Sequence, residues 1–146
     1  MNISKSRCDV STRIGFTATV SSSSSNWNSG TLVFPVVITN LGNGYDPNDG
    51  VFTAPTAGTY VFFVNIISYS TKTVSVKIIL NGGKKIDSLA QSENSNAYNS
   101  GSNLVVLPLQ KADRVWVSYN YGSGYYGSYT TANADPVFSR DPVMVF

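Results

Sequence analysis

The chain contains no histidine and a single cysteine, and these two shortages exclude much of enzyme chemistry. Without histidine there is no Ser-His-Asp or Cys-His nucleophile pair and no histidine metal site. Cys8 cannot form a disulfide within the chain, so it is expected to be a free thiol or a link between chains. The eight acidic residues show no spacing that suggests a facing pair of catalytic carboxylates. We therefore expect no catalysis, no cofactor and no metal site.

Charge and long apolar runs are also scarce. Only 12% of the residues are charged, the net charge is +2, and the closest basic pair is Lys84-Lys85. A nucleic-acid-binding surface needs a basic stripe, which is absent here. No apolar run approaches the roughly 18 residues of a membrane-spanning helix, so neither nucleic acid nor membrane is expected as a partner. Solubility then depends on Ser, Asn, Thr, Gly and Tyr, which is common in secreted β-sandwiches, and we expect a secreted, extracellular protein.

The dominant pattern is the alternation of apolar and polar residues that indicates β-strands, in a length that suits one domain. Pro35 predicts an edge strand or a break in the strand around it, and Asn81-Gly82 predicts a tight hairpin turn. The segments 21–30 and 88–103 are rich in Ser or Asn and are predicted to be loops. The predicted strands are 14–20, 31–39, 51–54, 59–67, 73–80, 104–109, 114–119 and 143–146.

One predicted strand, residues 60–67, is nearly apolar on both faces. A strand that exposes one face to solvent alternates, whereas a strand covered on both faces does not. Tyr60, Phe62, Phe63 and Ile66 are therefore predicted to lie in the core or in an interface with a partner subunit. Two explanations stay open for the second face: it is covered by another copy of the chain, or by loops of the same chain.

The aromatic residues also follow a familiar series. Phe34, Asn40, Tyr45, Phe52, Gly58, Tyr60 and Phe62, together with the segment 107–117, resemble the sequence signature of the complement C1q globular-head domain family. The chain departs from the family at Val64, at Ala112, where the family usually has glycine, and around Arg140. The resemblance implies a ten-strand jelly-roll β-sandwich of the C1q/tumour necrosis factor type that assembles as a homotrimer. Residues 14–146 would form this domain and residues 1–13 an N-terminal tail.

The segment 119–129 holds five of the nine tyrosines, spaced by Gly, Ser and Asn. Tyrosine supplies contact area and a hydroxyl at low entropic cost, so such a loop is typical of binding surfaces. The alternative is that these tyrosines only continue the packing of a strand. The candidate ligand-binding residues are Tyr121, Tyr125, Tyr126 and Asn120. Lys84 and Lys85, just past a hairpin tip, are candidates for contact with an anionic ligand, and the alternative is a solvated hairpin tip. The favoured function is lectin-like recognition of glycans or microbial surface molecules; the alternative is a secreted protein ligand for a receptor.

Overall fold

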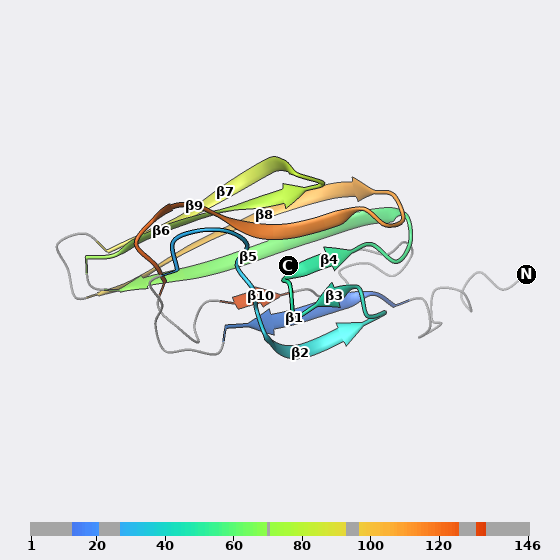
Figure 1. The fold of residues 1–146 in the computed structure, drawn as a ribbon, viewed down its shortest axis with the longest axis horizontal. Coiled ribbons are helices and arrows are strands. Elements are labelled where there is room, and N and C mark those ends of the chain that lie inside the picture. Colours follow the sequence, from blue (N-terminus) through green and yellow to red (C-terminus); the bar gives the residue numbers. More distant parts are fainter. Residues whose placement is uncertain (1–12, 21–26, 70, 93–96, 126–130, 134–146) are drawn as a thin grey trace, which may run out of the picture.

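In the computed structural model, residues 13–20, 27–69, 71–92, 97–125 and 131–133 are described, and all their regular structure is β-strand (Figure 1). No helix long and apolar enough to cross a membrane occurs in these residues. The ten strands are β1 (Gly15–Thr19), β2 (Val36–Leu41), β3 (Tyr45–Asp46), β4 (Val51–Thr53), β5 (Gly58–Tyr69), β6 (Thr73–Leu80), β7 (Gly83–Gln91), β8 (Tyr98–Leu109), β9 (Arg114–Gly122) and β10 (Thr131–Asn133).

The strands form two five-stranded antiparallel sheets. Sheet I has the order β2-β1-β10-β5-β8, and sheet II has the order β3-β4-β9-β6-β7. Strands that follow one another in the chain often lie in different sheets, which is the connectivity of a jelly roll. The buried side chains of both sheets form one core cluster. The predicted all-β jelly-roll sandwich is confirmed.

The aromatic series is a packing and hydrogen-bonding unit inside this core. The Phe16 ring stacks on Tyr45 with centroids 4.4 Å apart, and Phe52 contacts both Phe16 and Tyr60 at 5.6 Å. The Tyr45 hydroxyl accepts a hydrogen bond from Phe34 N (3.0 Å) and donates one to Phe34 O (2.9 Å). The series therefore specifies the fold rather than a ligand site.

Several strand boundaries differ from the prediction, although the prediction for Pro35 is confirmed. Pro35 does separate two extended pieces, an isolated bridge at Thr31 and β2, and β2 is also a sheet edge. The segment 88–103 is mostly strand, because β7 continues to Gln91 and β8 begins at Tyr98, so the prediction of a loop was wrong there. β9 likewise runs to Gly122, past the predicted end. The predicted strand 143–146 lies outside the described residues.

The Ser- and Asn-rich part of β8 closes one side of the sandwich. Asn103 Nδ2 donates to the Asp87 carbonyl oxygen and Asn99 Nδ2 donates to the Gln91 carbonyl oxygen, both at 2.8 Å. Between these two asparagines lies Gly101, where a Cβ would overlap the Leu89 carbonyl group. Two amides and one glycine thus let the edges of β7 and β8 meet, although the strands belong to different sheets. Polar composition here reflects this closure and not a solvated loop.

The second face of β5 is only partly covered. Tyr60, Phe62 and Ile66 point into the core and are fully buried, while Phe63 on the opposite face is partly buried. We use the term apolar face for Val61, Phe63, Leu104 and Val106, which pair across β5 and β8 on the outside of sheet I. Leu104 and Val106 are 50% and 54% exposed, so no loop in the described part of the chain covers them.

Candidate functional site

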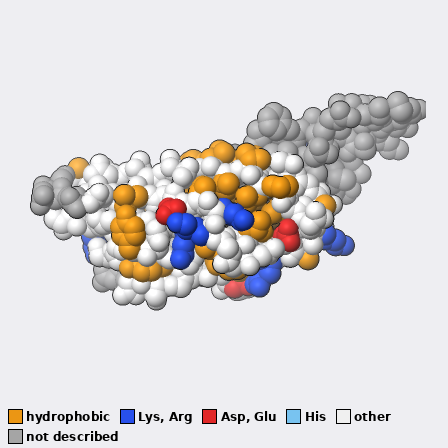
Figure 2. Space-filling model, turned by 90° about the horizontal axis from the view of Figure 1, so that it is seen from above, with side chains coloured by type: hydrophobic (Ala, Val, Ile, Leu, Met, Phe, Trp, Pro, Cys, Tyr) orange, Lys and Arg blue, Asp and Glu red, His pale blue; other side chains and the backbone are white. Residues whose placement is uncertain are grey.

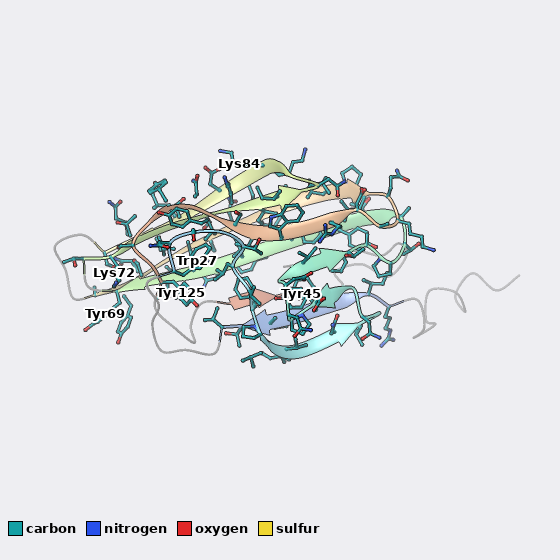
Figure 3. The ribbon with its side chains drawn as sticks, viewed as in Figure 1. Trp27, Tyr45, Tyr69, Lys72, Lys84 and Tyr125 are labelled. Carbon is teal, nitrogen blue, oxygen red and sulfur yellow. The ribbon has the colours of Figure 1, made fainter. Side chains whose placement is uncertain are left out.

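Three of the six predicted ligand-binding residues lie on the outside of sheet II. Lys84 is on β7, whereas Asn120 and Tyr121 are on β9, with β6 between them. Lys84 lies beside β7 at the upper edge of the molecule (Figure 3). The structure therefore brings together residues that are 36 positions apart, on a strand surface rather than on a loop.

Asp87 joins these residues, and sequence reasoning missed it. Its Oδ2 lies 3.2 Å from Lys84 Nζ and accepts a hydrogen bond from Asn120 Nδ2 at 3.3 Å. Asn120 Nδ2 also donates to Ser75 Oγ at 3.0 Å. Half of the Lys84 side chain (52%) and of the Asp87 side chain (43%) stays in contact with solvent. A carboxylate, an ammonium and an amide thus meet on an accessible surface.

Two irregularities in strand pairing create this arrangement. Residues 84 and 87 would face opposite sides of a regular strand, because side chains alternate. The register shift between Ile78 and Ile79 makes Lys85 an extra residue, and Lys84 and Asp87 then share one face. A second shift, between Ser75 and Val76, makes Asn120 an extra residue on β9. Strand alternation read from the sequence could not reveal either shift, which explains why Asp87 was overlooked.

Apolar side chains border the polar group on one side. Ser75 pairs with Leu89 on β7 and with Tyr121 on β9, so the three residues form a row across the outer face. Ser75 is buried, whereas Tyr121 is 48% and Leu89 44% exposed. We define the recognition patch as six residues: Ser75, Lys84, Asp87, Leu89, Asn120 and Tyr121. Seen from above, the molecule shows hydrophobic, basic and acidic side chains close together on its surface (Figure 2).

Tyr125 does not share this exposure. It is 7% exposed, belongs to the core cluster, and its ring lies 6.3 Å from Trp27, which also contacts the Tyr119 ring at 5.4 Å (Figure 3). In the structure Tyr125 is thus a packing residue, unlike Tyr121. Lys85 is exposed at the register shift, and Tyr126 lies outside the described residues.

Three groups with a shifted pKa in the described residues are structural. Burial raises the pKa of Tyr45 to about 12 and also raises the pKa of Tyr60. Hydrogen bonds from Gln110 N and from the Asn81 side chain lower the pKa of Asp113 at the hairpin ends.

No group of three or more metal-ligating residues occurs in the described part of the chain. The acidic segment 46–50 is a turn, since Asp46 and Asp49 accept hydrogen bonds from backbone amides two residues ahead.

Comparisons with known proteins agree with this architecture. The chain is 32% identical over 111 residues to mouse complement C1q tumor necrosis factor-related protein 3, and 36% identical over 110 residues to a rat complement C1q subcomponent. The matches cover 76% and 75% of this chain but 45% and 42% of the relatives, so the chain spans less than half of their length.

Two solved structures show the same fold. The globular domain of zebrafish complement 1qA protein superposes with a TM-score of 0.67 at 17% identity, covering 85% of this chain and 97% of that one. The Eiger TNF of S. frugiperda superposes with a TM-score of 0.63 at 12% identity, covering 81% and 88%. The family model of the C1q domain matches residues 15–139, which include both sheets and the aromatic series. The chain therefore belongs to the C1q domain family.

Proposed function

We propose that this chain is the head of a secreted recognition protein, that it binds glycans through the recognition patch, and that it assembles as a homotrimer through the apolar face. The observation that carries the proposal is the exposed Tyr121 ring beside the hydrogen-bonded group Lys84, Asp87 and Asn120. Aromatic rings pack against the C–H faces of sugars, while short polar side chains fix the hydroxyl groups. Complement relatives in the same family support recognition as the purpose.

The apolar face supports the assembly. Leu104 and Val106 are half exposed, and exposed apolar side chains that adjoin each other on a sheet mark interaction sites. A second copy of the chain is the proposed occupant, in a closed cyclic arrangement. The recognition patch lies on the outside of the other sheet, so it would stay accessible in such an assembly.

A glycan array with the purified chain tests the recognition proposal. Tyr121→Ala should abolish or strongly weaken the array signal, because the stacking surface is lost while the core is untouched. Lys84→Ala should weaken it, because Asp87 loses its ion-pair partner. Lys85→Ala is the matched control, since Lys85 carries the same charge next to Lys84 but lies at the register shift. Equal signals from all three variants would contradict the assignment of the patch.

Light scattering at micromolar concentration tests the assembly. The wild-type chain should give the mass of about three protomers, as expected of a closed trimer. Leu104→Glu places one charge per protomer into the apolar face and should give a folded monomer, whereas Leu89→Glu on sheet II should leave the mass unchanged. A wild-type monomer, or a trimer that tolerates Leu104→Glu, would show that the apolar face serves another purpose.

The second candidate function is a protein ligand for a receptor. It is favoured by the 32% identity to a protein named as C1q tumor necrosis factor-related. In that case the array should be blank, and the chain should bind to cells in a way that protease treatment of the cells abolishes and glycosidase treatment does not.

A further inference from the structure

We infer that the recognition patch takes a neutral sugar unit through two adjacent hydroxyl groups, with Asp87 as the hydrogen-bond acceptor. This inference rests on the proposed glycan recognition and specifies the chemical class of the ligand. It follows from the hydrogen-bonding capacity that remains after the contacts within the patch are formed.

The free capacity of the patch combines acceptors with donors. Asp87 uses Oδ2 for both Lys84 and Asn120, so among the described residues Oδ1 has no hydrogen-bonding partner. Asn120 Nδ2 has two hydrogens, and they are directed to Ser75 and Asp87, which leaves its Oδ1 as an acceptor. Lys84 commits one of its three ammonium hydrogens to Asp87. Two acceptor oxygens and the remaining ammonium hydrogens of Lys84 therefore stay available to a ligand.

A vicinal diol matches this set. One hydroxyl can donate to Asp87 Oδ1 while its neighbour accepts from Lys84 Nζ, and each hydroxyl both donates and accepts. An anionic sugar substituent offers acceptors only. It could pair with Lys84 but would leave Asp87 Oδ1 beside another negative charge. Lys77, which is directly opposite Asp87 on β6, offsets that repulsion in part.

The acceptors are held in position before any ligand arrives. Ser75 is 1% exposed and anchors the Asn120 amide from below. The backbone of Asp87 is fixed separately, because Asn103 donates to its carbonyl oxygen. Groups that are already ordered lose little freedom when a ligand binds, which favours binding.

The apolar border fits the same ligand. Tyr121 and Leu89 flank Ser75 from β9 and β7, which are separated by two strand spacings, about 10 Å. A single sugar ring can lie across Ser75 with its C–H face against Tyr121 and its hydroxyl edge toward Asp87. The geometry thus assigns one ring face to packing and one edge to hydrogen bonding.

Polysaccharides with and without intact diols provide the test. The probes are a mannan and a galactan, each native and after periodate oxidation followed by borohydride reduction, and heparin as the anionic probe. Periodate cleaves the carbon–carbon bond between adjacent hydroxyls, and reduction removes the aldehydes that would otherwise react with lysine. Binding to immobilised polysaccharide is measured at about 50 mM and about 300 mM NaCl, which brackets the range where charge screening changes strongly.

We expect at least one native neutral polysaccharide to bind, with at least roughly tenfold weaker binding after oxidation and little dependence on salt. Asp87→Asn should weaken the native interaction about tenfold or more, because a hydrogen bond to a charged acceptor is lost. Asp46→Asn is the matched control, since it removes the same charge from the end of β3, where Asp46 accepts a hydrogen bond from the following turn. Both variants should melt at the same temperature as the wild type.

Three other results would overturn the inference, and they differ in whether they also reject the proposed function. Neutral binding that survives oxidation, or heparin binding that strengthens in Asp87→Asn and falls steeply with salt, rejects the diol assignment but leaves glycan recognition standing. Failure of every probe to bind rejects both the diol assignment and the proposed function.

Discussion

The Tyr45 hydroxyl offers a sharp test of how the core is held. It is the partner of both the amide and the carbonyl of Phe34, at 3.0 Å and 2.9 Å. Tyr45 is 3% exposed and Phe34 1%, so water cannot replace the hydroxyl. Tyr45→Phe would leave two buried backbone groups unsatisfied, at about 1–3 kcal/mol each. We expect a loss of about 2–6 kcal/mol in the free energy of unfolding, a large part of the roughly 5–15 kcal/mol typical of a domain.

Tyr60→Phe is the matched control for this substitution. The Tyr60 hydroxyl donates only to the carbonyl oxygen of Thr56, at 2.6 Å, and Thr56 is exposed. Water can replace the lost partner, so the cost should stay near about 1 kcal/mol. Urea unfolding at one protein concentration, followed by tryptophan fluorescence, gives both free energies, provided that the urea dependence is the same. Losses within about 0.5 kcal/mol of each other would refute the reasoning.

The remaining predictions concern strand β5, one strained residue and high pH. Phe62→Ala should lower the free energy of unfolding by about 3–5 kcal/mol at any protein concentration, because Phe62 is fully buried against Phe52 and Tyr60. Phe63→Ala should instead stay folded and dissociate on dilution. Equal behaviour of the two variants in urea unfolding and light scattering would contradict this prediction. Ala112 has φ +74°, so Ala112→Gly should raise the free energy of unfolding by up to about 1 kcal/mol; a lower melting temperature would be the opposite result. The pKa of Tyr45 is raised from 10.0 to about 12 in the folded chain, so its neutral form contributes stability that is complete below pH 10.0 and is lost as the pH rises toward 12. The gap in urea midpoint between wild type and Tyr45→Phe should therefore narrow across this pH range, and a constant gap would show that Tyr45 does not titrate there.

The fold could be predicted because its determinants are local in the sequence. Asn81 and Gly82 both have positive φ, as their hairpin requires, and the alternation in β6 gives Val74, Val76 and Ile78 to the core. Ala112 shows that even a departure from the family was informative, since the position that usually holds glycine has a left-handed backbone here. The pattern of turn residues in one sequence therefore indicates directly where the backbone needs a positive φ.

The candidate site was only half predictable, because it depends on two register shifts and on contacts between strands. Lys84 and Asn120 were named for their types, but nothing in the spacing placed Asp87 between them. Tyr125 was predicted to be a surface residue because it lies in a glycine-rich segment, but in the structure its ring packs near Trp27. The asparagines of β8 misled in the same way, because their partners are carbonyls of a strand in the other sheet.

The two surfaces have complementary roles if both proposals hold. The recognition patch is shallow and half exposed, and a site with a few hydrogen bonds and one aromatic ring holds a single sugar unit weakly. Three patches on one trimer would act together on a repeating polysaccharide, because each binding event after the first becomes intramolecular. Assembly through sheet I would thus raise the strength of binding on sheet II without any contact between the surfaces. The edges of β7 and β8, closed by Asn99, Gly101 and Asn103, keep the two outer faces apart, so that one can be covered while the other remains open to ligand.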